Sequence, residues 1–296
     1  MKKILIVLML LISVSAFADE ATLIDFTKLT AAEDGENVAT TLDYSAYLMS
    51  GPVSTNTKIS LAMNNWTATI NSSSRTYEVQ RNCLVKEAPS TSSGSVLGVR
   101  ISFPDHDYNS YAEILPPFEI PVYNDQKVDF TQGLGVVRNI SLIKSISINV
   151  YGRNNPHELV LLLKDQDDRI IQVNFGSLQF SGWKKLTWEN PSYIEDVKDR
   201  ELVSIPDYPG KGATYVKFFG FILKRNSIVA AGDSIFYVKD ITMVYDKSDV
   251  STDPDFDDDA IWKIVEEREI ARNREEMIRI ARKIELLRLE QLRMHK

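Results

Sequence analysis

The feature that most restricts the fold is a series of alternating apolar and polar residues between Ile140 and Tyr245. Residues 145–150 (SISINV) and 171–175 (IQVNF) alternate strictly. A period of two places the apolar side chains on one face of a strand and the polar ones on the other. Turn-forming residues interrupt these runs at Asn154-Asn155-Pro156, Asp165, Asp167 and Asp168. The sequence therefore predicts a meander of antiparallel strands with one buried face.

Strand patterns extend beyond this meander. Residues 97–103 alternate in the same way, and almost no segment before residue 250 has a helical pattern. We therefore expect a mainly β fold, an antiparallel β-sandwich of jelly-roll type, with an up-and-down barrel as the alternative. Three prolines in residues 111–123 predict an edge strand or an extended passage there. Nearly continuous apolar residues in 215–223 and 235–245 predict two strands that are buried on both faces.

The last part of the chain has a different composition. Residues 249–259 contain six acidic residues, no basic residue and Pro254, which predicts a linker. Residues 260–296 contain no Gly or Pro, which predicts one α-helix of about 55 Å at 1.5 Å per residue. Apolar residues recur along it with heptad spacing. The seam is predicted to contact a partner through Ile270, Met277, Ile280, Ile284 and Leu287. The alternative is that the helix packs back on the sandwich or stays single and solvated.

The N-terminus has the pattern of a secretion signal. Lys2 and Lys3 precede an apolar core that is too short to span a bilayer, and Ala16-Phe17-Ala18 provides a small-x-small cleavage motif. We expect cleavage between Ala18 and Asp19, with residues 19–248 forming the sandwich. The mature protein is then expected to be exported without membrane insertion. Cys83 is the single cysteine, so an intramolecular disulfide cannot form, and a buried thiol is the expected state.

Charge and motifs exclude several functional classes. Removing Lys2 and Lys3 reduces the 34 basic residues to 32 against 41 acidic ones, a net charge of −9, so nucleic-acid binding has no electrostatic support. The three histidines lack the spacing of metal ligands, and no nucleophile motif is present. We expect no catalytic, cofactor-binding or metal-binding residues. An alternative function is a secreted carbohydrate-binding module or adhesin, in which Trp183, Trp188 and Tyr193 stack on sugar rings.

Several longer blocks carry a family resemblance. The sequence resembles the spirochaete flagellar filament outer layer (sheath) proteins, well over residues 95–248 and more weakly over 19–94. The blocks are LGVRISFP at 97–104, YAEILPPFEIPVY at 111–123, the segment 133–159, GWKKLTWENPSYI at 182–194 and FYVKDITMVYD at 236–246. The resemblance implies a structural protein in the periplasm that coats the flagellin core and affects filament stiffness and motility. It implies flagellin core proteins and other sheath subunits as partners, with self-association as a further expectation, and it brings no catalytic residues.

Overall fold

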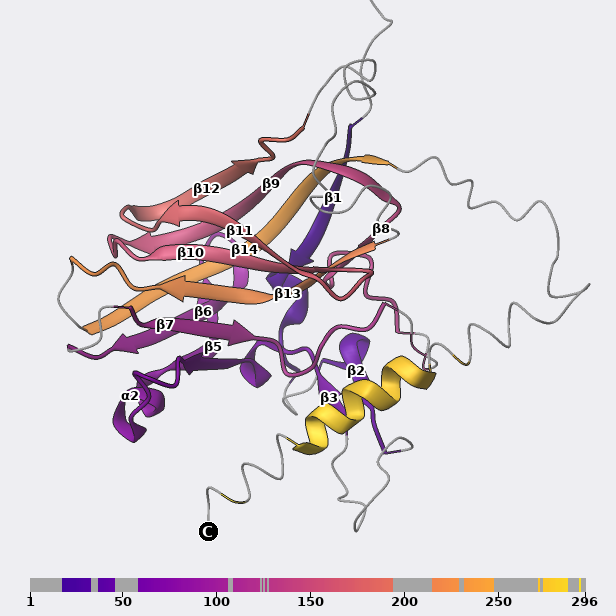
Figure 1. The fold of residues 1–296 in the computed structure, drawn as a ribbon, viewed down its shortest axis with the longest axis horizontal. Helices are drawn as coiled ribbons and strands as arrows, with labels where there is room; N and C mark the ends of the chain where they lie inside the picture. Colours follow the sequence, from indigo (N-terminus) through magenta and orange to yellow (C-terminus); the bar gives the residue numbers. More distant parts are fainter. Residues whose placement is uncertain are drawn as a thin grey trace, which may run out of the picture.

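Two six-stranded antiparallel sheets face each other in the computed structural model (Figure 1). The structure describes residues 18–32, 37–45, 58–105, 109–122, 124, 126, 128–193, 215–228, 232–247, 271, 274–286 and 293. One end of the sandwich carries the C-terminal helix, of which residues 274–286 are described without a break. The prediction of a mainly β, antiparallel sandwich with a C-terminal helix is confirmed. The two separate sheets rule out the barrel alternative.

The first sheet has the strand order β12-β9-β14-β6-β5, with β1 paired to β14. Its strands are β1 (Ala18–Asp25), β5 (Leu84–Ser90), β6 (Gly94–Phe103), β9 (Ile140–Arg153), β12 (Ser181–Glu189) and β14 (Gly232–Lys247). The second sheet has the order β11-β10-β13-β7-β4, with β8 paired to β13. Its strands are β4 (Thr67–Ile70), β7 (Tyr111–Leu115), β8 (Val136–Arg138), β10 (Glu158–Asp165), β11 (Ile170–Ser177) and β13 (Tyr215–Lys224).

Short elements complete the described fold. A separate two-stranded sheet pairs β2 (Thr41–Asp43) with β3 (Lys58–Ser60). Single 3-10 turns occur at η1 (Phe26–Leu29), η2 (Val38–Thr40) and η3 (Met63–Asn65). The helix α2 (Tyr77–Asn82) begins after Thr76, whose side chain accepts a hydrogen bond from the backbone N–H of Val79. Between η3 and α2, the strand β4 is only four residues long.

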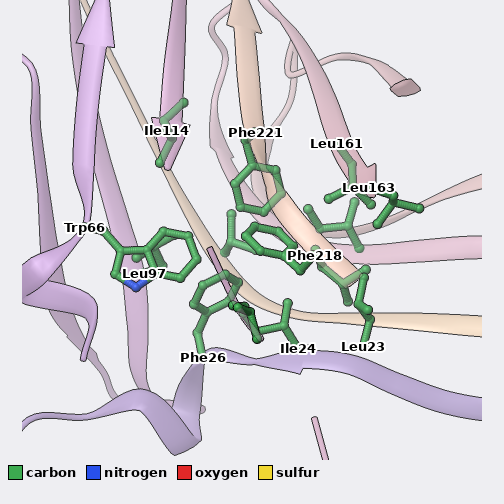
Figure 2. Packing of buried hydrophobic residues seen from close by; sticks show 14 of the residues in the cluster. Leu23, Ile24, Phe26, Trp66, Leu97, Ile114, Leu161, Leu163, Phe218 and Phe221 are labelled. Carbon is green, nitrogen blue, oxygen red and sulfur yellow. The ribbon is translucent and has the colours of Figure 1, made fainter. Parts of the chain in front are cut away.

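The core between the sheets is built around an aromatic cluster (Figure 2). Phe26, Trp66, Phe218 and Phe221 are buried, with ring centroids 5.4 Å apart for Phe26–Trp66 and 5.1 Å for Phe218–Phe221. The indole N–H of Trp66 donates to the carbonyl of Leu61 at 3.0 Å, so its one polar group is satisfied. Each such buried side chain contributes on the order of 1.5–3 kcal/mol.

Two expectations about individual strands are wrong. Tyr111–Leu115 forms β7, which lies between β13 and β4 in the second sheet, because its prolines begin only at Pro116. In β14, buried and partly exposed residues alternate, so this strand is buried on one face only. The strand β13 is buried on both faces, as expected. On its outer face, Ile222 joins Val160, Leu162 and Phe219 in a small apolar cluster.

Smaller expectations are confirmed. Cys83 is a free thiol with 5% of its surface exposed. The aspartates after β10 form the hairpin turn to β11, as their residue types predict.

The buried residue His157 predicts a pH dependence of stability. Burial, followed by the nearby charge of Arg225, lowers the pKa of His157 from 6.5 to about 4. Its Nδ1 accepts the backbone N–H of Asn226 at 3.1 Å, which requires the neutral ring. Below pH 6.5 the unfolded chain therefore takes up a proton that the folded chain does not bind until about pH 4. The free energy of unfolding should fall by about 3 kcal/mol over this interval.

Denaturant unfolding between pH 7 and pH 4 tests this expectation. His157→Gln, whose amide oxygen can accept the same hydrogen bond, should show a smaller fall because it does not titrate. If the free energy of unfolding falls equally with pH in the two proteins, His157 is not the cause of the pH dependence.

Candidate assembly surfaces

The C-terminal helix packs on the sandwich through one apolar face. Met277, Ile280 and Ala281 have 0%, 2% and 0% of their surfaces exposed and belong to the main core. Ile284 is partly buried against the same core. These positions follow the i, i+3, i+4, i+7 spacing of a single helical face. The described part of the seam is therefore covered by the chain's own core.

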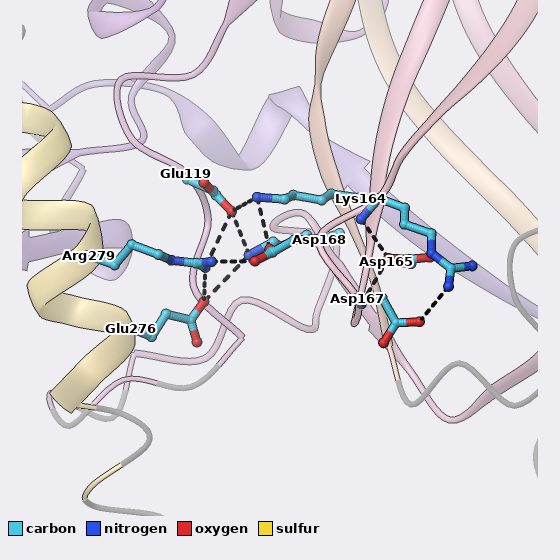
Figure 3. Close-up of polar contacts among 9 residues, drawn as sticks. Glu119, Lys164, Asp165, Asp167, Asp168, Glu276 and Arg279 are labelled. Carbon is cyan, nitrogen blue, oxygen red and sulfur yellow. Dashed lines mark hydrogen bonds and ion pairs between the residues drawn. The ribbon is translucent and has the colours of Figure 1, made fainter.

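Ion pairs surround this contact and centre on Glu119, which follows β7 (Figure 3). Its carboxylate lies 2.7 Å from Nζ of Lys164 on β10 and 3.0 Å from Nζ of Lys217 on β13. Arg279 of the helix reaches the same oxygen at 3.6 Å. Lys217 is 1% exposed, so these anionic partners replace the water that its ammonium group loses on burial.

The helix completes the network with one acid and one base. Arg279 binds Asp168 at 2.6 Å, and Glu276 lies 3.5 Å from Lys217. We call the full set the helix-docking network. Its three cations are Lys164, Lys217 and Arg279, and its three anions are Glu119, Asp168 and Glu276. An ion network that is neutral and satisfied can be buried without a large net cost.

Turn geometry positions Asp168 for this role. The carboxylate of Asp165 accepts the backbone N–H groups of Asp167 and Arg169, both at 2.9 Å. Asp168 has a φ of 62°, a left-handed conformation that Asp tolerates better than most residues. The turn thus aims the Asp168 carboxylate at Lys164 and Arg279.

The network shifts the ionisation of its members. Burial raises the pKa of Glu119, but the charges of Lys217 and Lys164 and their hydrogen bonds lower it by more, so the net pKa is below its ordinary value. For Asp168, burial likewise raises the pKa, but contact with Lys164 and Arg279 lowers it by more, so the net pKa is below its ordinary value. Since both pKa values are depressed, their stabilisation is present above the ordinary carboxyl pKa and is lost as the pH falls through the folded values.

The structure separates the three residues predicted to stack on sugars. Trp183 and Trp188 are five positions apart on β12, so they point to opposite faces of the sheet. Trp183 is 40% exposed, whereas Trp188 is partly buried against the core. Tyr193 lies beyond the strand, where its hydroxyl donates to Asp246 at 3.1 Å and Lys144 covers its ring. These three residues do not share a surface.

A different aromatic surface was missed by sequence reasoning. Tyr151 on β9 pairs in register with Trp183 on one side and with Tyr237 of β14 on the other. Ring centroids are 5.5 Å apart for Tyr151–Trp183 and 5.9 Å for Tyr151–Tyr237. We call these three side chains the aromatic row. Only the strand order brings them together, because they lie far apart in the sequence.

Comparison with known proteins identifies the family. The profile described as "Flagellar filament outer layer protein Flaa" matches residues 31–254. The flagellar filament outer layer protein of Spirochaeta aurantia is 40% identical over 275 residues, which cover 86% of this chain and 81% of the relative. That of Treponema pallidum is 37% identical, with 95% and 91% covered. This chain belongs to the flagellar filament outer layer protein family.

Solved structures similar to this flagellar filament outer layer protein are distant. One is a family 11 carbohydrate-binding module of a Clostridium thermocellum cellulase, with 12% identity and a TM-score of 0.32, covering 62% of this chain and 88% of the module. Another is the module TmCBM61 in complex with beta-1,4-galactotriose, with 11% identity and a TM-score of 0.31, covering 62% and 90%. At these TM-scores the likeness says nothing about what this chain binds.

The predicted partner residues of this family member divide into three groups. Met277 and Ile280 lie in the core, so a partner could reach them only if the helix left the sheets. Ile284 is partly buried, while Ile270 and Leu287 lie outside the described residues. On the opposite side of the helix, Ile278 and Leu286 line a surface pocket, and Leu286 is 63% exposed.

The described part of this outer layer protein has no cluster of three His, Cys, Asp or Glu side chains that could hold a metal ion. Among the described helices, none has the length and apolarity to cross a membrane.

Proposed function

We propose that this chain is a structural subunit of the outer layer of periplasmic flagellar filaments, where it coats the flagellin core and contributes to stiffness and motility. The observation that carries this proposal is the family match over residues 31–254, together with 40% identity to an outer layer protein over 86% of the chain. No enzymatic role is proposed, because the family is one of filament outer layer proteins.

The architecture supports a mechanical role. The two sheets share one continuous core, and the helix-docking network joins the helix residues Glu276 and Arg279 to β13 and to the turn after β10. A close-packed interior of this kind has low compressibility, so bending of the filament would be resisted by the subunit itself as well as by its contacts. Flagellin core proteins and neighbouring copies of this chain are the proposed partners.

A strain that lacks this protein tests the function. Its periplasmic flagella should still contain the flagellin core but be thinner and bend more easily, and the cells should swim more slowly. Complementation with the full chain should restore all three properties. Filaments of unchanged diameter and stiffness in the deletion strain would overturn the proposal.

Export to the periplasm predicts a specific N-terminus. The predicted cleavage after Ala18 leaves Asp19, whose strand β1 pairs with β14 from Asp19↔Tyr245 onward. Mass spectrometry of the protein from isolated flagella should therefore find Asp19 as the first residue. Ala18→Gln, which violates the small-residue rule at the cleavage site, should accumulate the uncleaved form. A native chain that still begins at Met1 would contradict export by this route.

The domain limits remain part of the proposal. We propose a signal at 1–18, a sandwich at 19–248, a linker at 249–259 and a helix at 260–296. Because Met277, Ile280 and Ala281 lie in the sandwich core, the helix is also expected to contribute to the stability of the sandwich.

A further inference from the structure

The aromatic row lies across three adjacent strands on the outward face of the first sheet. On β9, Tyr151 alternates with the buried residues Ile148 and Val150, which places its ring on the face away from the core. Its partners Trp183 and Tyr237 have the same orientation because directly paired residues share a face. The rings follow one another across the sheet in edge-to-face contacts, with centroids 5.5 and 5.9 Å apart and interplanar angles of 76° and 75°.

Next to the row, Tyr237 packs closely over Gly98 of β6, with which it pairs. A Cβ atom at this position would lie 3.3 Å from Cδ1 of Tyr237 and 3.2 Å from the Lys86 carbonyl oxygen. The glycine therefore lets the Tyr237 ring lie close to the sheet at this end of the row.

Polar side chains surround the aromatic row on this face. Between Ser145 and Arg153 on β9, and along β12, every outward position carries an aromatic, hydroxyl, amide or charged side chain and none is aliphatic. Aromatic rings surrounded by hydrogen-bonding groups suit a ligand that has both C–H faces and hydroxyl groups, as sugar rings do.

Cations flank the row on both sides. Arg153, two positions after Tyr151, is exposed, and its guanidinium lies 5.6 Å from the centroid of Tyr237. Lys185, two positions after Trp183, is exposed beside Asn149, whose amide donates to Asp240 at 2.6 Å. Guanidinium and ammonium groups next to stacking surfaces favour a ligand that carries carboxylates.

The geometry points to a binding site for an acidic oligosaccharide, in which sugar rings stack on Trp183 and Tyr151 while Arg153 and Lys185 bind carboxylates. This site is additional to the proposed structural role and would give the outer layer a contact with carbohydrate. It does not depend on the seam of the C-terminal helix.

Calorimetric titration of the purified full-length mature protein tests this site. The probes are a hyaluronan hexasaccharide, which carries carboxylates, and chitohexaose, which has N-acetylated sugars without them. Hyaluronan should bind saturably and more tightly than chitohexaose. Trp183→Ala and Tyr151→Ala should each weaken binding about tenfold. Arg153→Gln with Lys185→Gln should remove the preference for the acidic probe while leaving the thermal unfolding temperature nearly unchanged.

Tyr77→Ala is the matched control, because Tyr77 is an 82% exposed aromatic residue on α2, outside the row. It should bind as the unmodified protein does. Absence of saturable binding, or unchanged binding in folded Trp183→Ala, would overturn the proposal. If the unmodified protein binds neither oligosaccharide and the Trp183→Ala variant is missing from isolated flagella, the proposal is also overturned, and the row is a contact with another protein. Because the titration uses isolated protein, its failure leaves the proposed filament role unaffected.

Discussion

Replacing Lys217 with methionine should lower the free energy of unfolding by about 3–5 kcal/mol. Lys217 is 1% exposed and lies between Glu119 at 3.0 Å and Glu276 at 3.5 Å. Removing its charge leaves the helix-docking network with three anions and two cations, and the two carboxylates that faced it are only 9% and 11% exposed. The loss arises less from the attraction of one pair than from carboxylates that are left without their partner. Urea unfolding at pH 7 measures it.

Two controls separate this effect from a simple loss of charge. Arg100→Met removes one partner of the Arg100–Asp233 pair, whose side chains are 42% and 38% exposed, and should change stability by only about 0–1 kcal/mol. Adding Glu119→Gln to Lys217→Met restores neutrality and should recover part of the loss. If Lys217→Met costs no more than Arg100→Met, the network does not stabilise the docked helix.

The double variant Ile280→Asp with Ile284→Asp should release the C-terminal helix from the sandwich. Ile280 is 2% exposed, and a carboxylate there would lie in an apolar core without a partner. We expect a loss of at least about 3 kcal/mol, since a large buried side chain is removed and a charge is introduced. The sandwich should keep its β-type circular dichroism but melt at a lower temperature. The tail should become sensitive to protease, and less protein should co-sediment with flagella.

Leu286→Asp is the matched control, because it places the same charge on the same helix at a side chain that is 63% exposed. It should leave thermal stability and protease resistance nearly unchanged. A double variant as stable as Leu286→Asp would contradict the docked position of the helix. If the double variant is destabilised but still co-sediments fully with flagella, the filament contact lies on the faces of the sheets and not on the helix.

Local patterns were sufficient to predict the sheets. Ile146, Ile148 and Val150 alternate with polar residues and are fully buried, because the period of a strand depends only on neighbouring positions. The hairpin at Asp165–Asp168 follows from its residue types in the same way. The prolines in residues 111–123 predict an edge strand, but all three follow Leu115, so they do not prevent Tyr111–Leu115 from lying inside the second sheet.

Contacts between distant segments could not be predicted from local patterns. An apolar seam on a helix serves equally to bind a partner or the chain's own sheet, so Met277 and Ile280 allowed both interpretations. The helix-docking network joins the loop after β7, two strands, a hairpin turn and the C-terminal helix, and no local spacing records that arrangement. The aromatic row is likewise a product of the strand order β12-β9-β14. Its one signal in the sequence is that Tyr151 and Tyr237 occupy outward positions in otherwise alternating strands.

Electron microscopy of purified periplasmic flagella, with antibody labelling of this protein, tests the outer-layer role most directly. Labelling should run along the outer surface of the filament and disappear, with a decrease in filament diameter, in a strain that lacks the protein. Label that is confined to the cell body, or a filament that remains unlabelled and unchanged in diameter, would contradict the assignment to the outer layer.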